Sequence, residues 1–361
     1  MTLQLLREWP PGFGGVERVA HELAVYWQTQ GCPNTVFSFG GAHIDRLPGD
    51  DPLPVPYGRV LLPRLRLGRL LLPMPSRPLW HLLRSPEPLH AHLPCPGVLL
   101  VLVLACVLQP RRQLSVHWHA FLDGGLHRAY QQLALAVVRW LPLVVTTSPP
   151  LAAGLVRRGC RPSRVRVLPC CLDAAGETAA LALPERPHAA SLRVLFIGRL
   201  DSYKRVDWLI QALAALPQPW QLDVVGTGPR RAAFEALAHN LPVRFWGRLE
   251  EQAKHERLAQ ATLLVLPSDR CNEAFGIVQL EAMASGLPSL AFDLPDSGMA
   301  WVGRLPRLQW SMAPVDLADV LARLAADPVA LAVLGRQARQ RYQRLFARSV
   351  WLRRLDRLAW H

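Results

Sequence analysis

The strongest constraint on the fold is a regular alternation of short apolar runs and amphipathic stretches between residues 192 and 302. The apolar runs have the length of buried strands, and the stretches between them follow a helical period. Strands that alternate with helices in this way form a doubly wound parallel sheet. The strands are expected at residues 194–197, 222–225, 243–246, 263–266 and 289–292.

The first half of the chain shows the same alternation less cleanly. The apolar run that follows Gly97 predicts a buried helix, because it is longer than a typical strand. Residues 41–88 are interrupted by prolines and have no clear period, so no element is assigned to them. Other elements are expected as strands at 3–6, 35–39 and within 115–121, 143–150 and 165–171, and as helices at 16–28 and 331–361.

A length of 361 residues favours two lobes. Residues 172–191 lack a sustained apolar period and contain Gly, Pro and Ser, which is typical of a linker. The expected fold class is therefore α/β, with two Rossmann-like doubly wound domains that face a central cleft. The expected boundaries are 1–175 for the first domain, 190–345 for the second domain and 346–361 for a C-terminal helix that packs back towards the first domain.

The charge of the chain favours an anionic partner. Lys and Arg number 41 against 27 Asp and Glu, which gives a formal net charge of +14. Nucleic acid, phosphorylated small molecules and an acidic membrane surface would all suit this charge. An equally good explanation is compositional bias, because arginine far outnumbers lysine and Ala, Leu and Pro are also abundant.

The apolar runs and the cysteines bear on the cellular compartment. The longest apolar run, residues 98–108, is about half of the ~20 residues that a membrane-spanning helix needs. No signal-peptide pattern stands at Met1, so we expect the cytoplasm. Seven cysteines without a C-x-x-C pair are expected to be free thiols and argue against a zinc ribbon.

Two glutamates stand where a loop leads into a predicted helix. Glu273 follows the strand at 263–266, and Glu281 lies inside the helix that Phe275, Gly276 and Ile277 are expected to open. Unpaired amides at a helix start suit a diphosphate, and the carboxylates can accept hydrogen bonds from sugar hydroxyls. The alternative is that Glu273 is a helix-favouring acid of the first turn and Glu281 a solvated helix residue.

Two cations follow the strand at 194–197. Arg199 and Lys204 flank a short loop after Gly198, where they could neutralise a leaving diphosphate. Surface cations are also common loop residues, so the alternative is a pair of solvated side chains.

Glycines mark two further loops. Gly14 and Gly15 would let the backbone approach a ligand before a helix begins, although a simple turn explains them equally well. Gly226 and Gly228 in VVGTGPRR look like a phosphate loop. The segment lacks the last glycine and the acidic partner of the dinucleotide fingerprint, which disfavours nicotinamide binding.

Four histidines occur in two pairs with strand spacing. His90 with His92, and His117 with His119, each place both members on one face of a strand. Four imidazoles could ligate zinc, but no motif such as H-E-x-x-H accompanies them. A histidine that holds or deprotonates an acceptor hydroxyl is the favoured alternative.

Taken together, these segments resemble glycosyltransferase family 4. Residues 263–295, LLVLPSDRCNEAFGIVQLEAMASGLPSLAFDLP, are similar to the hallmark of this family: two glutamates separated by seven residues, then an apolar helix and Gly-x-Pro. The segments at 14–24, 198–213, 224–231 and 245–261 follow in the expected order. Residues 89–94, 118–121 and 297–302 are also similar to a subgroup that transfers mannose or rhamnose in lipopolysaccharide O-antigen assembly.

The resemblance implies roles for single residues. Glu273 would contact the hydroxyls of the donor sugar and Glu281 the ribose of the nucleotide. Arg199 and Lys204 would hold the diphosphate. The residues expected to contribute to donor binding through their backbone are Phe275, Gly276, Ile277, Gly226, Gly14 and Gly15.

The resemblance also implies a mechanism and a fold, in which the first domain (1–175) binds the acceptor and the second (190–345) binds the nucleotide sugar. His119 falls where family members carry an acceptor-site histidine. Family enzymes have the GT-B fold, retain the anomeric configuration, and need no metal and no cofactor besides the nucleotide-sugar co-substrate. The leaving phosphate itself would accept the proton of the acceptor. The implied reaction moves a hexose from a nucleotide-diphosphate sugar to a saccharide or lipid-linked acceptor in cell-surface polysaccharide synthesis.

The sequence departs from the family pattern at three places. Arg205 stands where glycine is usual, WHAF lacks the acidic residue that often follows the histidine, and GRLPRLQWSMAP (303–314) replaces a glycine-rich segment. These departures bear on the donor sugar and the acceptor and leave the glutamate pair intact.

Two alternatives and one further partner follow from the same residues. A nucleotide-sugar epimerase of the same fold would need no second substrate. A basic nucleic-acid-binding protein is disfavoured, because no recognition module is present. The basic, apolar segment 59–73 and the Arg-rich last helix could contact anionic lipid at the inner face of the cytoplasmic membrane, or they could be core-facing segments with arginine rims.

Overall fold

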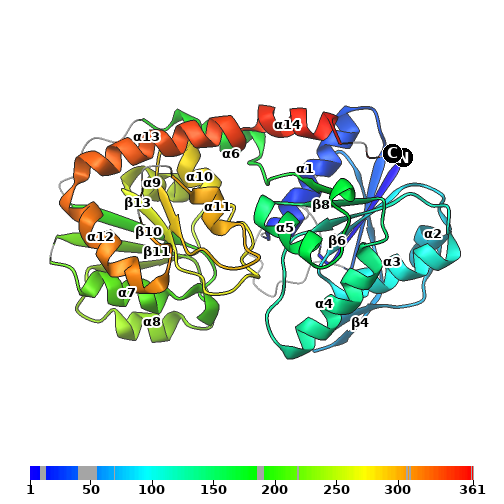
Figure 1. Ribbon diagram of the computed structural model, residues 1–361, viewed down its shortest axis with the longest axis horizontal. Helices are drawn as coiled ribbons and strands as arrows, with labels where there is room; N and C mark the ends of the chain where they lie inside the picture. Colours follow the sequence, from blue (N-terminus) through cyan, green and yellow to red (C-terminus); the bar gives the residue numbers. More distant parts are fainter. Residues whose placement is uncertain are drawn as a thin grey trace. The chain divides into compact units, whose positions relative to one another are not determined.

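A computed structural model describes residues 1–8, 14–39, 55–68, 70–184, 191–217, 219–305, 308, 310–358 and 360. The chain forms two compact units (Figure 1). The first contains residues 1–168 and 356–361, and the second contains residues 169–355. Each unit is built on its own sheet.

The first unit contains a parallel sheet of seven strands in the order β3-β2-β1-β6-β7-β8-β9. Every residue of β1, β6 and β7 is buried, as expected where helices cover both faces of a parallel sheet. The order reverses between β1 and β6, and such a switch point is where open α/β sheets bind ligands. The strands are β1 (Thr2–Leu6), β2 (Asn34–Ser38), β3 (Gly58–Leu61), β6 (Leu89–Leu93), β7 (Leu114–Trp118), β8 (Leu143–Thr146) and β9 (Val165–Val167).

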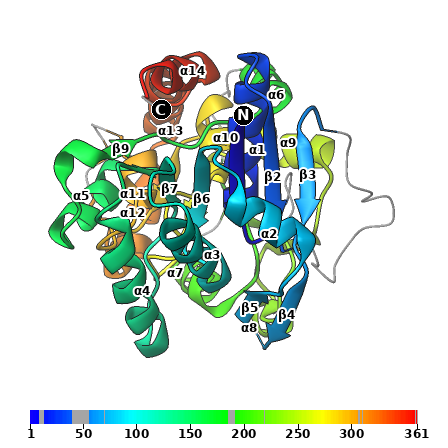
Figure 2. The same cartoon turned by 90° about the vertical axis from the view of Figure 1, so that its right-hand side faces the viewer.

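The helices of this unit lie in the connections between strands, and several of these strands and helices can be followed in Figure 2. They are α1 (Gly15–Thr29), α2 (Arg77–Arg84), α3 (Pro96–Leu108), α4 (Gly125–Val138) and α5 (Pro149–Arg157). Helix α3 is the apolar run after Gly97, and its residues 98, 99, 101 and 102 are buried, so the predicted buried helix is confirmed. An antiparallel hairpin of β4 (Arg64–Leu67) and β5 (Leu70–Pro73) occupies part of the segment that the sequence left unassigned.

The second unit contains a parallel sheet of five strands in the order β12-β11-β10-β13-β14. These are the five strands expected from the sequence, with ends that differ by at most two residues: β10 (Leu192–Ile197), β11 (Trp220–Val225), β12 (Val243–Gly247), β13 (Leu263–Leu266) and β14 (Ser289–Ala291). The order reverses between β10 and β13. The loops after these two strands are therefore where a ligand is expected.

The helices of the second unit are α6 (Ala174–Ala182), α7 (Val206–Ala214), α8 (Arg231–Leu237), α9 (Glu251–Gln260), α10 (Val278–Ala284), α11 (Met299–Gly303), α12 (Leu317–Ala326), α13 (Pro328–Leu345) and α14 (Arg348–Asp356). The last residue of α14, Asp356, belongs to the first unit. Helix α10 packs against α6 and α13. The buried hydroxyl of Tyr342 in α13 donates a hydrogen bond of 2.8 Å to Glu177 in α6.

The division between the units falls after Leu168. The segment 172–191, expected as a linker, carries helix α6, and its residues 185–190 lie outside the described residues. The last residues of the chain belong to the first unit, where the hydroxyl of Tyr26 donates a hydrogen bond of 2.6 Å to Asp356. All seven cysteines are free, as expected. No helix in the described part of the chain is long and apolar enough to cross a membrane.

Candidate functional site

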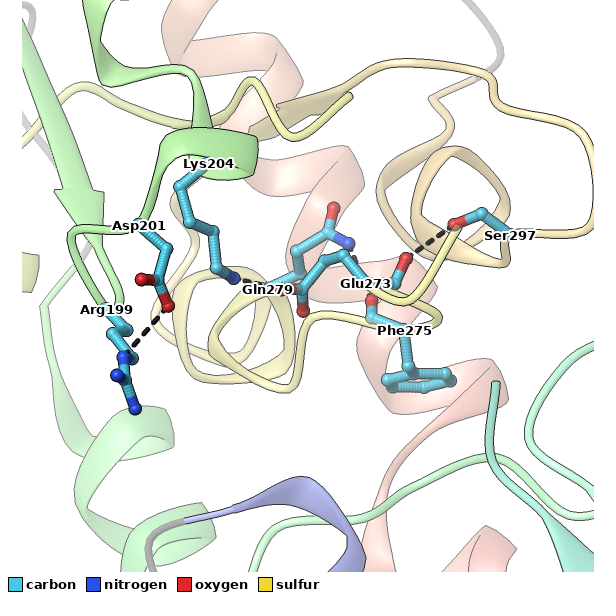
Figure 3. Close-up of polar contacts among 7 residues, drawn as sticks. All are labelled: Arg199, Asp201, Lys204, Glu273, Phe275, Gln279 and Ser297. Atoms are coloured by element: carbon cyan, nitrogen blue, oxygen red, sulfur yellow. Dashed lines mark hydrogen bonds and ion pairs between the residues drawn. The ribbon is translucent and has the colours of Figure 1, made fainter. Parts of the chain in front are cut away.

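Two of the predicted site residues meet at the switch point of the second sheet. Lys204 lies in a short turn after β10, and Glu273 lies in the loop after β13. The ammonium group of Lys204 donates to the carboxylate of Glu273 in an ion pair (Figure 3). The two side chains are 10% and 18% exposed, so the alternative of solvated charges is wrong for this pair.

The ion pair keeps Lys204 charged. Burial by itself would lower the pKa of Lys204, but the attraction of Glu273, with smaller contributions from Tyr203 and Asp201, outweighs burial and raises the pKa above its usual value. The site therefore holds a buried cation at neutral pH. Its carboxylate partner can accept hydrogen bonds from hydroxyl groups.

Arg199 belongs to the same loop and remains accessible. Its guanidinium group is 2.9 Å from the carboxylate of Asp201, and its side chain is 60% exposed. Figure 3 shows Arg199 and Asp201 on the same side of Glu273 as Lys204. The loop after β10 thus presents one buried and one exposed cation.

Gly226 and Gly228 fix the loop that carries these cations. A side chain on Gly226 would place its Cβ 1.9 Å from the carbonyl oxygen of Gly198, and Gly226 adopts a φ of +135°. A Cβ on Gly228 would lie 2.5 Å from the carbonyl oxygen of Leu200. The amide of Leu200 also donates to the carbonyl of Thr227 at 2.9 Å. Both glycines therefore act here as packing residues that hold the backbone on either side of Arg199.

Arg205, the departure from the usual glycine, adopts the left-handed conformation with a φ of 49°. Its guanidinium group contacts Asp207 at 3.0 Å and Asp269 at 3.3 Å and lies 3.6 Å above the ring centroid of Trp208. Glycine suits this position because the left-handed backbone conformation is unfavourable for a residue with a Cβ atom. In this chain the interactions of the arginine side chain hold the turn, and Asp269 links it to the loop after β13.

The loop of Glu273 is held by two buried polar side chains. The hydroxyl of Ser297 donates to the carbonyl of Glu273 at 2.7 Å. The amide nitrogen of Gln279 donates to the carbonyl of Phe275 at 2.9 Å (Figure 3). It also donates to the carbonyl of Met299 at 3.1 Å. Gln279 is fully buried in α10. Sequence reasoning missed both side chains, although a glutamine on a helix of otherwise apolar character between the two glutamates was a usable signal.

The start of helix α10 differs from the prediction. The helix begins at Val278, with Ile277 as its N-cap, so Phe275 and Gly276 precede it. Gly276 adopts a φ of +69°, which lies outside the helical range and favours glycine. A Cβ atom at this position would lie 2.8 Å from the Cδ1 atom of Leu266. The side chain of Phe275 is buried, and its carbonyl is engaged by Gln279.

Glu281 is buried, which contradicts the alternative of a solvated helix residue. The ammonium group of Lys254 in α9 lies 3.1 Å from its carboxylate, and both side chains are at most 10% exposed. The same ammonium group also contacts Glu251 at 2.7 Å, and that carboxylate is mostly exposed. Sequence reasoning missed Lys254, because nothing in the pattern of α9 pairs it with a residue 27 positions later.

The predicted residues of the first unit lie at the ends of its central elements. Gly14 is the N-cap of α1 and Gly15 its first residue, and a Cβ on Gly14 would lie 2.0 Å from the carboxylate of Glu17. His119 directly follows β7, and its side chain is buried. The structure places these residues in a different unit from Glu273, so a cleft shared by all of them stays a prediction.

The four histidines form one stacked cluster. The rings of His117 and His119 lie 4.3 Å apart and nearly parallel, and His92 stacks on both. His90 contacts His92 edge to face. Burial lowers the pKa of all four rings, that of His117 to about 3, so they are neutral near pH 7.

In the described part of the chain, His90, His92 and His117 lie close enough to share a metal ion, with ligand atoms within 4.8 Å of one another. Both nitrogens of His92 are already hydrogen-bonded, one to Gln4 and one to His119, each at 2.9 Å. His92 could bind a metal only if it lost one of these bonds. The hydrogen bonds therefore favour a network of neutral histidines over a metal site.

Comparison with known families accounts for this arrangement. Residues 13–175 match the model described as Glycosyltransferase Family 4, and residues 191–327 match the model described as Glycosyl transferases group 1. Both halves of the chain are glycosyltransferase domains. The residues of the Lys204–Glu273 pair and the Lys254–Glu281 pair all belong to the group 1 domain.

One curated relative aligns with almost the whole of this glycosyltransferase. It is 26% identical over 350 residues to the D-rhamnosyltransferase WbpZ of Pseudomonas aeruginosa, an alignment that covers 92% of this chain and 88% of WbpZ. Other curated relatives align over shorter segments, and the chain spans only 20% to 39% of their length.

Solved structures confirm the fold of this glycosyltransferase. The chain superposes on Anabaena Alr3699/HepE in complex with UDP with a TM-score of 0.76, at 18% identity and with 99% and 98% of the two chains covered. It superposes on the lipopolysaccharide outer core galactosyltransferase WaaB with a TM-score of 0.71, at 19% identity and the same coverage. The expected α/β architecture with two Rossmann-like domains is therefore confirmed.

Proposed function

We propose that this glycosyltransferase moves a hexose from a nucleotide-diphosphate sugar to a hydroxyl of a saccharide or lipid-linked saccharide. The buried pair of Lys204 and Glu273 at the switch point of the second sheet carries the proposal. It places a cation for phosphate beside a carboxylate for sugar hydroxyls, which are the two groups on either side of the bond that breaks. The binding of UDP by HepE is consistent with this class of donor.

In the proposed reaction Arg199 and Lys204 stabilise the leaving diphosphate. The charge on that group grows as the sugar departs, and fixed cations act most strongly on charge that develops in the transition state. Glu273 orients the donor sugar, and the buried Glu281 accepts hydrogen bonds from the ribose. Because the two cations supply the positive charge, the proposed reaction needs no metal and no cofactor.

The finer assignment concerns the sugar and the acceptor. We propose a mannose-type or rhamnose-type donor, transfer with retention, and a role in cell-surface polysaccharide synthesis such as lipopolysaccharide O-antigen assembly. The alignment with the D-rhamnosyltransferase WbpZ over 92% of the chain supports this choice. His119, buried at the end of β7, would contact the hydroxyl of the acceptor.

A contact with the inner face of the cytoplasmic membrane would bring the enzyme to a lipid-linked acceptor. Strand β4 supports this part of the proposal, because Leu65 and Leu67 are exposed on one of its faces. Exposed leucines can enter the apolar region of a lipid surface, and the formal net charge of +14 suits anionic lipid. Flotation with anionic and with neutral vesicles, using L65S/L67S as the variant, tests this contact.

The decisive experiment has two steps. A thermal-shift panel of GDP-, UDP-, ADP- and dTDP-sugars identifies the donor, because a ligand at 100 times its Kd stabilises the native state by about 2.7 kcal/mol. The donor is then incubated with and without saccharide acceptors, and products are followed by mass spectrometry. Conversion of the donor alone into an isomer would indicate an epimerase. Absence of binding to any nucleotide sugar, together with salt-sensitive binding of oligonucleotides, would contradict the proposal.

A further inference from the structure

Three buried side chains form a continuous hydrogen-bonded chain across the first sheet. Gln4 lies on β1, His92 on the adjacent strand β6, and His119 at the end of β7. The Oε1 atom of Gln4 lies 2.9 Å from Nε2 of His92, and Nδ1 of His92 lies 2.9 Å from Nε2 of His119. At its other end, Gln4 contacts the carbonyl oxygen of Ala20 at 3.1 Å.

The carbonyl of Ala20 fixes the direction of every bond in this chain. A carbonyl oxygen can only accept, so the amide group of Gln4 must present its NH2 to Ala20 and its oxygen to His92. The oxygen of Gln4 can only accept as well, so Nε2 of His92 carries a hydrogen. A neutral imidazole carries one hydrogen, and Nδ1 of His92 is therefore an acceptor. His119 must then donate from Nε2, which leaves a lone pair on its Nδ1.

The rings of His92 and His119 are neutral, as the assignment of their hydrogens requires. Burial lowers the pKa of His92 and of His119 well below 6.5, and the neighbouring His90 and His117 lower both further. Gln4 is an uncharged residue, so it orients His92 without stabilising an imidazolium ion as a carboxylate would. His90 stands outside the chain, because its Nδ1 is paired with the hydroxyl of Ser115 at 2.8 Å.

We propose that Gln4, acting through His92, sets the tautomer of His119 so that Nδ1 of His119 accepts a hydrogen bond from the acceptor hydroxyl. Gln4 and His92 are positioning residues, and only His119 would touch the substrate. The tautomer itself follows from the hydrogen bonds, whereas its use on an acceptor hydroxyl rests on the proposed function.

The tautomer can be measured without substrate. In the full chain labelled with 15N-histidine, long-range nitrogen–hydrogen NMR spectra near pH 7.5 distinguish a protonated ring nitrogen from a bare one. A His119→Gln variant assigns the resonances of His119. We expect Nε2 of His119 to carry the hydrogen and Nδ1 to be bare. A wild-type protein in which Nδ1 of His119 carries the hydrogen would overturn the proposal.

Replacement of Gln4 tests whether its hydrogen bond to His92, rather than packing alone, sets the tautomer of His119. Gln4→Leu removes the acceptor for His92, so a fraction of His119 should shift its hydrogen to Nδ1. The matched control is Ser115→Ala, which removes the hydrogen bond of His90 and should leave His119 unchanged. A shift in Ser115→Ala as large as in Gln4→Leu would mean that the tautomer responds to packing alone.

Turnover links the tautomer to the reaction. In Gln4→Leu, kcat should fall in proportion to the fraction of His119 with a bare Nδ1, about twofold if half of the rings have shifted, while the KM for the donor is unchanged. If the spectra show the expected tautomer but His119→Gln turns over at the wild-type rate, the role of His119 in the proposed function fails while the hydrogen-bonded chain stands. A loss of kcat in Gln4→Leu without a change of tautomer contradicts the positioning role of Gln4.

Discussion

Lys204 and Glu273 come from loops that follow two adjacent strands and form a buried ion pair at the point where the strand order reverses. The two residues lie far apart in the sequence. The pair therefore exists only because β10 and β13 lie side by side. The ion pair links Lys204, the residue proposed to bind the diphosphate, to Glu273, the residue proposed to bind the sugar.

Replacement of the cations should reduce turnover. We expect Lys204→Met and Arg199→Met each to lower kcat about 10²- to 10³-fold, the usual effect of losing one group that stabilises developing charge. Product formation at saturating donor measures the effect. Arg199→Lys, which keeps the charge of an exposed side chain, serves as the control and should retain much of the activity. Near-normal kcat in both methionine variants would contradict the proposed mechanism.

The two partners of Lys254 provide a matched pair of variants. Glu281→Gln leaves a buried ammonium group without its buried carboxylate, so the free energy of unfolding should fall by about 1–3 kcal/mol and the KM for the donor should rise. Glu251→Gln removes an exposed partner of the same ammonium group and should change stability by less than about 1 kcal/mol. Urea unfolding and donor titration measure both effects. Equal effects of the two variants would show that burial of Glu281 has no energetic consequence.

Much of the fold could be predicted from the sequence, because buried strands and amphipathic helices leave a local periodic signal. Both parallel sheets and the buried helix α3 follow from such signals. The hairpin β4–β5 could not be predicted, because its leucines alternate with arginines and prolines in a segment without a clear period.

The site could be predicted only in part. Glu273 and Lys204 could be predicted as site residues, because each is a charged residue in the loop after a strand. Their ion pair could not be predicted, because it depends on the order of the strands in the sheet, which no local pattern encodes. The burial of Glu281 could not be predicted, because a charged side chain in a helix usually faces solvent. Residues 279–284 of helix α10 are all buried, so Glu281 is buried together with its neighbours on every side of the helix.

Arg205 offers a test of backbone strain beside the site. Arg205→Ala and Arg205→Gly both remove the contacts to Asp207 and Asp269, but only glycine relieves the left-handed conformation. That conformation costs a residue with a Cβ atom roughly 1–2 kcal/mol. The glycine variant loses about 0.4–1 kcal/mol through the greater entropy of its unfolded chain. Urea unfolding should therefore find Arg205→Gly at least as stable as Arg205→Ala, and a less stable glycine variant would contradict this account of the turn.

Removal of metals should leave activity intact. The proposed reaction relies on Arg199 and Lys204 for positive charge, so dialysis against EDTA should not change kcat. Turnover before and after dialysis, with metal content measured in parallel, provides the test. A loss of activity that Mg²⁺ or Mn²⁺ restores would show that the two cations are insufficient.

The histidine cluster predicts an acid-sensitive first unit. The pKa values of His90, His92, His117 and His119 are lowered in the folded state, so the unfolded state binds more protons once the pH drops below about 6.5. The stability that these rings contribute is therefore fully present above pH 6.5 and is lost as the pH falls towards their folded pKa values. Each ring contributes a slope of up to about 1.4 kcal/mol per pH unit in that range.

Urea unfolding between pH 7.5 and pH 5 measures this slope. His117→Phe removes the ring whose pKa falls to about 3 and should reduce the slope by up to about 1.4 kcal/mol per pH unit. If His117→Phe keeps the wild-type slope, the acid sensitivity arises elsewhere. If the wild-type protein shows no loss of stability below pH 6.5, the histidines of the cluster bind protons as readily in the folded state as in the unfolded state. The inference that burial keeps these rings neutral would then be wrong.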